Sequence, residues 1–309
     1  MSDLSVMARE QAQVYPTAAR VVEEIAHEAA SLLGPGIQFL MAQRQGFWPE
    51  AERLLQMSLA LGGSPVEALV EYTMAYLKEQ AAFVRSNEYS NKEFDDVRRE
   101  VYDNPDVMKR FYLEGLLLTH AFWPIHFDIH NFFMTEFVGR VGNAGTGTEF
   151  GFGHGLYMLE VLSHRPGTKM HGFDISEHAR DYARRLMQFG AIDEQRYQLD
   201  FADVRERFAA PDGAFNFAMF AEIVEHIPDP HYSLRELRRT LTPGSPAFIT
   251  TVVNSNAIDH IFLFKDPAEV PPLLTQAGFQ VVAERVLKVS DYGASRDPSI
   301  DVAYVCVAS

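Results

Sequence analysis

The sequence predicts an α/β protein, in which a doubly wound, mostly parallel sheet follows an all-helical region. Up to about residue 140, apolar residues recur at helical spacing with few β-branched runs between them. After Gly145, short apolar runs alternate with amphipathic segments, a pattern typical of a parallel sheet covered by helices on both faces. We therefore expect a helical domain over residues 1–140 and a sheet domain over residues 141–309.

Turn and capping residues mark the helices of the first region. Ser64 precedes Pro65 and Glu67, so Ser64 is expected to cap a helix whose first turn contains Pro65, with Glu67 reaching back to the cap. Breaks between helices are expected at residues 34–36, 62–63 and 87–91. These signals predict five or six helices.

Seven strands are expected in the second region, separated mainly by helices. They lie near residues 146–150, 169–174, 196–200, 214–220, 246–253, 279–288 and 300–308. Asp229 and Asp266 each precede a proline and should cap helices, and Glu269 completes a capping box behind Asp266. Only a turn-rich segment, 292–298, connects the last two strands, so these two strands should pair antiparallel.

Charge and cysteine content exclude several classes of function. Lys and Arg number 27 against 42 Asp and Glu, which gives a formal charge of −15. Phosphate backbones and anionic lipids are bound through Lys and Arg, so we expect neither nucleic acid nor membrane partners. The single cysteine, Cys306, excludes an internal disulfide and an iron–sulfur cluster. With no signal peptide or apolar span in view, we expect a cytoplasmic protein.

A glycine-rich segment ends the first predicted strand and opens the next helix. Gly151, Gly153 and Gly155 allow a tight turn and close approach of the backbone to a ligand, while helix N–H groups point into the same space. Glu149 precedes them, where its carboxylate would repel a pyrophosphate but accept hydrogen bonds from an ammonium group. The segment therefore predicts a ligand with an amino-acid end. The alternative is an ordinary glycine turn beside an exposed acid.

Two further acids stand at the ends of the second and third predicted strands. Asp174 lies where an acid can accept hydrogen bonds from both hydroxyls of a ribose. Asp203 is placed to accept from an adenine amine, with Phe201 or Val204 against the ring. The alternatives for each acid taken alone are that Asp174 merely helps to cap the following helix and that Asp203 is a solvated surface residue. Three acids at successive strand ends favour one nucleoside site.

Together these motifs resemble the class I S-adenosylmethionine-dependent methyltransferases over about half of the chain. The segments 220–230 and 273–279 are similar to those of ubiquinone- and menaquinone-biosynthesis methyltransferases. Asn216 departs from the Asp usual in that family. The resemblance implies S-adenosylmethionine as cofactor, S-adenosylhomocysteine as product and the strand order 3-2-1-4-5-7-6. The cofactor residues that it implies are Glu149, Gly151, Gly153, Gly155, Asp174, Ile175, Asp203, Val204 and Phe220.

The catalytic residues are open to two interpretations. The resemblance places His226 just past the fourth strand, where it is either a base that removes a proton from the acceptor or a support for its own loop. Glu222 is expected to line the methionine end of the cofactor or to orient the acceptor, unless it is an exposed loop acid. Further candidates for proton removal are Tyr112, His120 and His126.

An aromatic segment with several histidines, residues 111–137, runs directly into the first strand. Most of its aromatic rings should pack in the core. Its position nevertheless predicts a lid over the cofactor mouth that makes an apolar acceptor pocket. His126 and His130 share a helix face, so a metal bound with His120 or Glu136 is an alternative. We expect no metal, and instead neutral histidines in the core or in the pocket wall.

The leading hypothesis is a methyltransferase acting on a small hydrophobic or aromatic metabolite in a biosynthetic pathway. One alternative is a protein of the same fold that uses S-adenosylmethionine without transferring its methyl group, as a cyclase would. Another is a helical dimerisation or metal-binding module with a degenerate cofactor domain. A dehydrogenase would instead bind NAD. We also expect a homodimer through the helical domain.

Overall fold

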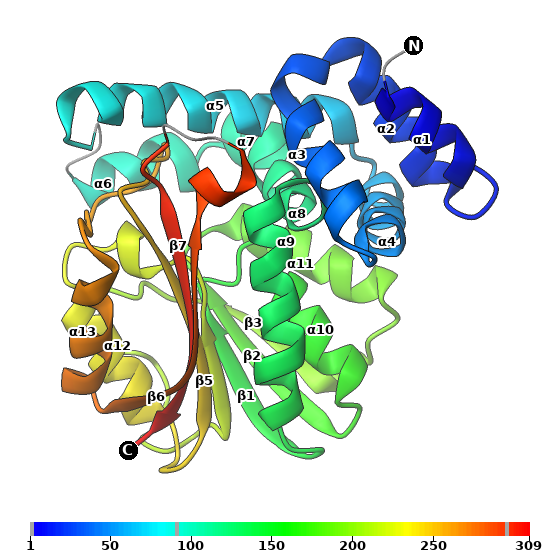
Figure 1. Cartoon of the computed structure of the whole chain (residues 1–309). Helices are drawn as coiled ribbons and strands as arrows, with labels where there is room; N and C mark the ends of the chain where they lie inside the picture. The colour runs from blue at the N-terminus through cyan, green and yellow to red at the C-terminus, as the bar shows by residue number, and fades with distance from the viewer. Residues whose placement is uncertain (1–2, 90–92, 294–296) are drawn as a thin grey trace.

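The protein has a helical region set across one edge of a seven-stranded sheet, as a computed structural model shows (Figure 1). The structure describes residues 3–89, 93–293 and 297–309. Parts of the predicted segments 87–91 and 292–298 therefore lie outside the described residues. Within these ranges, no helix is both long enough and apolar enough to cross a bilayer.

The N-terminal region is helical, as predicted, but it is divided into more segments than expected. Its α-helices are α1 (Asp3–Gln11), α2 (Pro16–Glu28), α3 (Ala30–Gln43), α4 (Phe47–Ala60), α5 (Pro65–Ser86), α6 (Phe94–Val97), α7 (Pro105–Val107), α8 (Leu113–Phe122) and α9 (Pro124–Phe132). Three π-helical turns, η1 (Arg98–Tyr102), η2 (Met108–Tyr112) and η3 (Phe133–Phe137), and the 3₁₀ turn η4 (Val138–Arg140) join them.

Two expectations about these helices were wrong. Helix α3 runs straight through the break predicted at 34–36 and holds Pro35 in its interior. Burial of Leu33, Ile37 and Leu40 offsets the lost hydrogen bond. Ser64 does precede α5, but its side chain makes no capping hydrogen bond.

At the start of α5, a carboxylate that is distant in the sequence accepts a backbone hydrogen bond. The Glu114 carboxylate accepts hydrogen bonds from the Ser64 backbone N–H at 3.2 Å and from the Ser58 hydroxyl at 2.5 Å. Sequence reasoning limited to neighbouring residues has no access to such a contact.

The sheet confirms the predicted order, β3-β2-β1-β4-β5-β7-β6. Its strands are β1 (Gly145–Phe150), β2 (Thr168–Asp174), β3 (Tyr197–Phe201), β4 (Phe217–Phe220), β5 (Pro246–Val253), β6 (Phe279–Lys288) and β7 (Ile300–Ala308). Strands β1 to β5 are parallel, and β7 pairs antiparallel with both β5 and β6. Because β7 runs backwards, its first residues lie beside the carboxyl end of β5.

Four α-helices connect the strands: α10 (Leu156–His164), α11 (Glu177–Phe189), α12 (Pro230–Thr240) and α13 (Val270–Gln276). A helix was also expected between the third and fourth strands, but residues 202–216 form turns and loops. The 3₁₀ turns are η5 (Glu194–Arg196), η6 (Val224–His226), η7 (Pro267–Glu269) and η8 (Val289–Tyr292).

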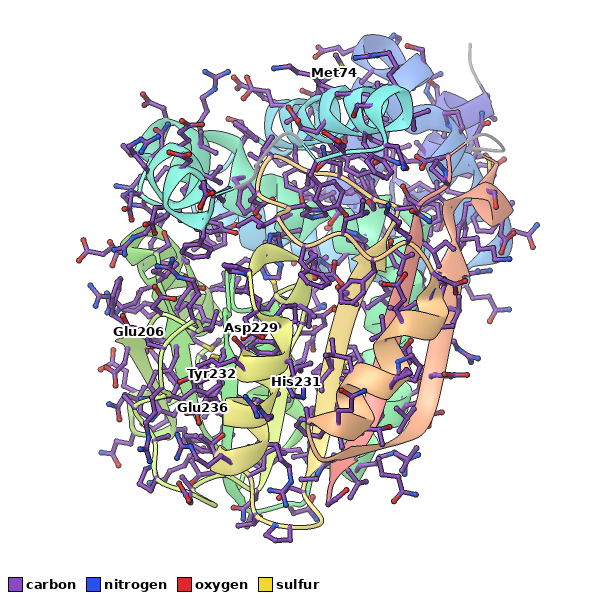
Figure 2. All side chains as sticks on the ribbon, turned by 90° about the vertical axis from the view of Figure 1, so that its left-hand side faces the viewer. Met74, Glu206, Asp229, His231, Tyr232 and Glu236 are labelled. Carbon is purple, nitrogen blue, oxygen red and sulfur yellow. The ribbon has the colours of Figure 1, made fainter. Side chains whose placement is uncertain are left out.

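The capping predictions for α12 and η7 are confirmed. The Asp229 carboxylate accepts from the backbone N–H of Tyr232 at 3.0 Å, and Asp266 and Glu269 form a capping box. Figure 2 shows Asp229, His231, Tyr232 and Glu236 together along α12, on the side of the molecule away from α10 and α11.

Each face of the sheet packs against its own helices (Figure 1). On one face, Phe248 of β5 contacts the rings of Phe133, Phe137 and Tyr157 at centroid distances of 5.0, 5.7 and 5.6 Å. The next residue along β5, Ile249, points to the other face and joins the core that contains Leu234 and Leu274 of α12 and α13. The η3 segment is therefore part of the cover of the sheet.

Candidate active site

A cavity of about 550 Å³ lies where the carboxyl ends of the parallel strands meet α5, α8 and α9. Seven acidic residues line it: Glu149, Asp174, Asp203, Glu222, Asp259, Asp297 and Asp301. No Lys or Arg of the described residues does so. Tyrosines, histidines and aliphatic side chains from the helices complete the wall, so the cavity is acidic at its polar positions and apolar elsewhere.

The three glycines after β1 have left-handed backbone conformations but different neighbours. Gly151 and Gly153 line the cavity, with φ of 72° and 50°. A Cβ atom at Gly153 would meet nothing within 4 Å, which leaves open space for a ligand. Gly155 does not line the cavity. A Cβ there would lie 2.8 Å from the Ala183 Cβ, so Gly155 permits α10 to pack against α11.

Glu149 is buried beside this loop, with 2% of its surface exposed. Its Oε2 atom is buried without a hydrogen-bond partner among the described residues. Burial, and secondly Asp174, raise the pKa of this carboxyl well above its ordinary value. An ammonium group in the cavity would supply the missing donor and positive charge, so the amino-acid end of S-adenosylmethionine fits the residues present.

Asp174 connects two loops at the floor of the cavity. Its Oδ2 accepts from the Gly153 N–H at 2.9 Å and its Oδ1 from the Ser176 N–H at 2.8 Å. Burial raises its pKa to about 6. A carboxylate oxygen can accept more than one hydrogen bond, so these contacts leave capacity for ribose hydroxyls. Ile175 lines the cavity beside it.

The residues that follow β3 match the adenine site predicted from the sequence only in part. Asp203 lines the cavity, but Arg205 holds its carboxylate, with Nη2 to Oδ2 at 2.7 Å. Burial alone would raise the pKa of Asp203, and the Arg205 contacts lower it below its ordinary value. Val204 lines the cavity, whereas Phe201 is half exposed and does not. Phe220 also lies outside the wall, fully buried in the core.

His226 reaches the cavity wall from η6. Its Nδ1 lies 3.0 Å from the Asp259 carbonyl oxygen, so Nδ1 carries the proton of this contact and Nε2 is the remaining nitrogen. The nearest acid to Nε2 is Glu225, whose Oε1 is 3.7 Å away. The ring of His260 packs against His226 with centroids 5.0 Å apart.

Two tyrosines hold Asp259 behind His226. Tyr112 donates to the Asp259 Oδ2 at 2.5 Å and Tyr102 donates to the same atom at 3.2 Å. Each tyrosine is the last residue of a π-helical turn, η2 and η1. Such turns often occur at functional sites, because the extra residue redirects side chains. Tyr112 thus lines the cavity and also supports the residue that orients His226, while its role in proton removal stays a prediction.

Glu222 follows β4 with a left-handed backbone, φ 54°, which is uncommon for a residue other than glycine. Thr250 fixes it, because the Glu222 N–H donates to the Thr250 hydroxyl at 2.9 Å and that hydroxyl donates to Glu222 Oε1 at 2.5 Å. Burial, and then Glu225, raise the pKa of Glu222. The backbone conformation directs a carboxyl group into the cavity wall rather than to solvent.

One acid-and-histidine group in the cavity region has the spacing of metal ligands. Glu225, His226 and His260 offer ligand atoms within 4.8 Å of one another, and all three are buried. Oε1 of Glu225 is buried and has no hydrogen-bond partner among the residues that the structure describes. This group differs from the histidines that the sequence put forward for a metal.

His120 of α8 and His126 of α9 line the cavity. His126 Nδ1 lies 2.7 Å from the Thr119 hydroxyl. Burial lowers the pKa of His126 to about 4, and burial followed by His154 lowers that of His120. Both rings are therefore neutral near pH 7, as expected for buried histidines.

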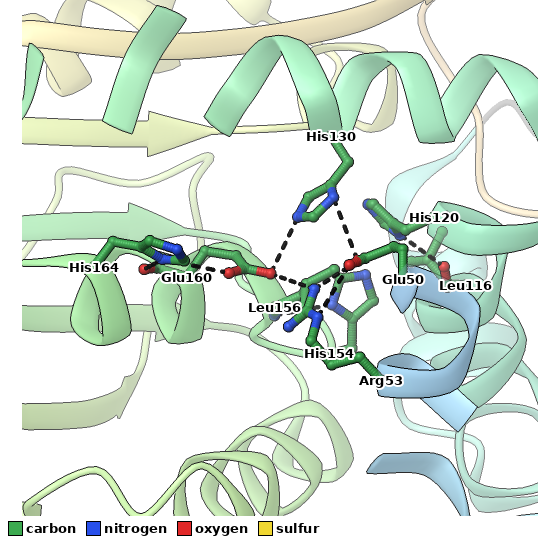
Figure 3. Close-up of polar contacts among 9 residues, drawn as sticks. All are labelled: Glu50, Arg53, Leu116, His120, His130, His154, Leu156, Glu160 and His164. Carbon is green, nitrogen blue, oxygen red and sulfur yellow. Dashed lines mark hydrogen bonds and ion pairs between the residues drawn. The ribbon is translucent and has the colours of Figure 1, made fainter. Parts of the chain in front are cut away.

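Among the described residues, His120, His126 and His130 are not a group whose ligand atoms all lie within 4.8 Å of one another. His130 Nε2 contacts Glu160 at 3.1 Å, and Arg53 joins Glu160 to Glu50 with two contacts of 2.5 Å (Figure 3). Glu136 lies on the surface beside Arg140. Glu50, His130 and Glu160 are close enough for a metal, but the Arg53 guanidinium already supplies the positive charge there.

Several cavity residues were not found from the sequence. Tyr72 and Tyr76 come from α5, Asp259 and His260 from the segment after β5, and Asp301 from β7. A usable signal existed for Asp301, because it is the single charged residue of an otherwise apolar strand. For Tyr72 and Tyr76 the sequence held no such signal, because aromatic residues at helical spacing are typical of the side of a helix that packs in the core.

The strand order and the acid-bearing loops define a class I methyltransferase fold. A geranyl diphosphate methyltransferase solved with S-adenosylmethionine has a TM-score of 0.51 over 63% of this chain and 90% of that one, at 13% identity. A geranyl diphosphate C-methyltransferase from Streptomyces coelicolor has a TM-score of 0.50 over 68% of this chain and 88% of that one, at 14% identity.

Sequence comparison agrees with the fold. Residues 133–286, about half of the chain, match the model of a methyltransferase domain family. A ubiquinone biosynthesis O-methyltransferase of Pseudomonas paraeruginosa is 28% identical over 196 residues, which covers 60% of this chain and 80% of that protein. One from Pseudomonas aeruginosa is 26% identical over the same length. The chain belongs to the class I S-adenosylmethionine-dependent methyltransferases, with S-adenosylmethionine as its cofactor.

Proposed function

We propose that the protein methylates a hydroxyl oxygen of a small, hydrophobic or aromatic metabolite, with His226 as the base that takes the hydroxyl proton. The observation that carries this proposal is the orientation of His226. Its Nδ1–H donates to the Asp259 carbonyl at 3.0 Å, so Nε2 is the atom free to accept a proton at the cavity wall. The similarity to O-methyltransferases supports oxygen as the acceptor atom.

The apolar part of the wall supports a hydrophobic acceptor. Leu116, Trp123, Ile125 and Ile129 of the α8 and α9 segment line the cavity together with Leu32. Burying apolar ligand surface against such side chains is favourable by roughly 25 cal/mol per Å². We assign this side to the acceptor and the loops after β1, β2 and β3 to the cofactor.

S-adenosylmethionine, when bound, supplies a methyl carbon activated by a positively charged sulfur. The chain contributes binding and orientation: Glu149 receives the amino group, Asp174 the ribose, and Asp203 with Val204 the adenine. Glu222 orients the acceptor beside His226, while Tyr102 and Tyr112 hold Asp259 and thereby the His226 ring. Holding both reactants in line accounts for much of the acceleration expected of such an enzyme.

Replacing His226 tests the proposed base. His226→Ala should lower single-turnover methylation by about 10²–10⁴-fold, the usual contribution of a general base, and leave S-adenosylhomocysteine affinity within a few-fold. The assay uses methyl-labelled S-adenosylmethionine with an extract of the source organism, and mass spectrometry of the labelled product. His231→Ala, on α12 and outside the cavity wall (Figure 2), is the matched control.

Three results would contradict parts of the proposal. If no labelled product forms with the wild-type protein, methyl transfer to a metabolite is excluded for that extract. If His226→Ala keeps the wild-type rate and pH profile, the proton goes elsewhere, and His120, His126, Glu222 and Tyr112 are tested next. If cofactor affinity falls together with the rate, His226 supports its loop instead.

We also propose that two copies pair through the helical region, since exposed apolar side chains such as Val14 and Met74 lie on it. Light scattering at several concentrations measures the mass of the assembly directly, and a monomer throughout would exclude this pairing.

A further inference from the structure

Asp301 is an acid of the cavity wall that has no role in the proposed methylation. It is the second residue of β7 and pairs in register with Val252, at the carboxyl end of β5. Only 4% of its surface is exposed, and it lines the cavity. Among the described residues no donor lies within hydrogen-bond distance of its carboxyl group. The closest polar neighbour is His126, with Nε2 at 3.7 Å from Oδ2.

Among the described residues around Asp301, none supplies a compensating positive charge. His126 is neutral near pH 7, since burial lowers its pKa to about 4. The other charged groups that act on Asp301 are acids: after burial, Glu222 and Asp297 raise its pKa further above the ordinary value. Asp297 is itself satisfied by the Ser299 hydroxyl at 2.5 Å and the Gln80 amide at 3.0 Å. Within the part of the chain that the structure describes, Asp301 is therefore a buried acid with neither a donor nor a counter-charge.

Aromatic rings stand beside this acid. Tyr72 and Tyr76 of α5 pack against Trp123 with ring centroids 5.7 and 5.1 Å apart, and Trp123 packs against His126 at 5.2 Å. All four side chains line the cavity. The electron-rich faces of tyrosine and tryptophan attract cations, most strongly where water is excluded. We call Tyr72, Tyr76 and Trp123 the aromatic wall.

Burying an acid without a hydrogen-bond partner costs free energy of folding. Such an acid is explained where a bound ligand supplies the missing partner. A phosphate or carboxylate on the ligand would find no Lys or Arg in the described wall and would face the acids instead. A neutral, wholly apolar ligand would leave Asp301 as it is. A protonated nitrogen would supply both the donor and the charge.

We propose that the methyl acceptor carries a protonated amine, which Asp301 binds with help from Glu222 beside the aromatic wall. This inference rests on the proposed function in taking the cavity as the acceptor site, and it adds the chemical class of the acceptor: a hydroxylated, largely apolar molecule with a cationic nitrogen. Asp301 is a specificity residue in this scheme. His226 remains the base.

Binding of three matched phenols to the protein saturated with S-adenosylhomocysteine tests the inference. Tyramine carries an ammonium group, para-ethylphenol is neutral and para-hydroxyphenylacetate is an anion, on otherwise similar skeletons. Calorimetry should show tyramine binding about tenfold or more tighter than para-ethylphenol, as a charge-assisted hydrogen bond provides, with the anion weakest. Asp301→Asn should remove this preference. Glu284→Gln, an exposed acid on β6, should keep it.

The outcomes separate the two proposals. Loss of the tyramine preference in Asp301→Asn, with unchanged S-adenosylhomocysteine affinity, supports the inference and shows that the variant folds. Equal binding of the three phenols, tighter binding of the anion, no binding of tyramine, or a preference that Asp301→Asn retains would overturn it. Because the readout is binding, a failure of methyl transfer in the labelled extract contradicts the proposed function without affecting this result.

Discussion

Glu149 is placed for binding at a cost in stability. Its buried Oε2 lacks a partner among the described residues, and burial raises its pKa well above its value near 4.5. The native state then binds more protons than the unfolded state from about pH 4.5 up to the raised pKa. By linkage, the stability of the unliganded protein falls as pH rises through this window.

Glu149→Gln should remove that pH-dependent loss. The free energy of unfolding of the variant, measured with urea in the absence of cofactor, should equal or exceed that of the wild type, and the difference should grow as pH rises from 4.5. Affinity for S-adenosylhomocysteine should fall at the same time, because an amide cannot supply the negative charge for the ammonium group. A variant less stable than wild type at pH 7 would show that Glu149 has a partner in the folded state.

Residues of the cofactor half were predictable where a loop motif fixes them. Glu149 and Asp174 lie at the ends of β1 and β2, and Val204 lies three residues after β3, so the motif fixes their positions closely. All three residues line the cavity. Phe220 was assigned by the same reasoning but points into the core, because side chains alternate between the two faces of β4. Asp259 and Asp301 come from loops and strands far along the chain, and only the assembled sheet brings them to His226 and His126.

At the level of elements, the glycine loop performs two separate tasks. Gly153 leaves room for a ligand, whereas Gly155 leaves room for α11. Alanine is strained at both positions, since both backbones are left-handed. Only at Gly155 does the new Cβ also meet a buried atom, the Ala183 Cβ at 2.8 Å.

Gly155→Ala should therefore be less stable than Gly153→Ala by about 1–3 kcal/mol, the usual cost of overpacking a core. Gly153→Ala should instead lower S-adenosylhomocysteine affinity more than its stability. Urea unfolding and calorimetry on the two variants give both quantities. Equal stabilities would mean that α10 and α11 separate without cost.

The sequence predicted that the helical region is a lid, which stays a prediction, and the structure shows that the last part of this region covers the sheet. Phe133 and Phe137 of η3 pack on Phe248, and the family match begins at residue 133. Periodicity identified these rings as core, but it could not tell which core, because that depends on where η3 lies against β5. The boundary between the two regions therefore remains a proposal, and η3 packs with the sheet.

At the scale of the whole molecule, the formal net charge of −15 attracts or repels charged ligands before they bind. S-adenosylmethionine has a net positive charge near pH 7, from its sulfonium and ammonium groups against one carboxylate, whereas S-adenosylhomocysteine is neutral overall. A strongly acidic protein with an acidic cavity attracts the former through long-range electrostatics.

The association rate of S-adenosylmethionine should fall by about tenfold or more between roughly 0.01 M and 1 M salt, as the Debye length shrinks from about 30 Å to about 3 Å. The rate for S-adenosylhomocysteine should change much less. Stopped-flow fluorescence can follow both, since Trp123 lines the cavity. The same salt dependence for both ligands would rule out electrostatic steering by the protein.

The position of β7 between β5 and β6 also sets an order of events during synthesis. The loops that we propose to hold the cofactor are complete once β4 has left the ribosome, but Asp297 and Asp301 are the last of the described cavity residues to emerge. Ser299 then bonds to Gln80 and Tyr76, at 2.8 and 3.1 Å, and fastens α5, made more than 200 residues earlier, over the finished sheet. A nascent chain can thus form the proposed cofactor loops early, whereas the cavity wall is complete only when the final strand inserts.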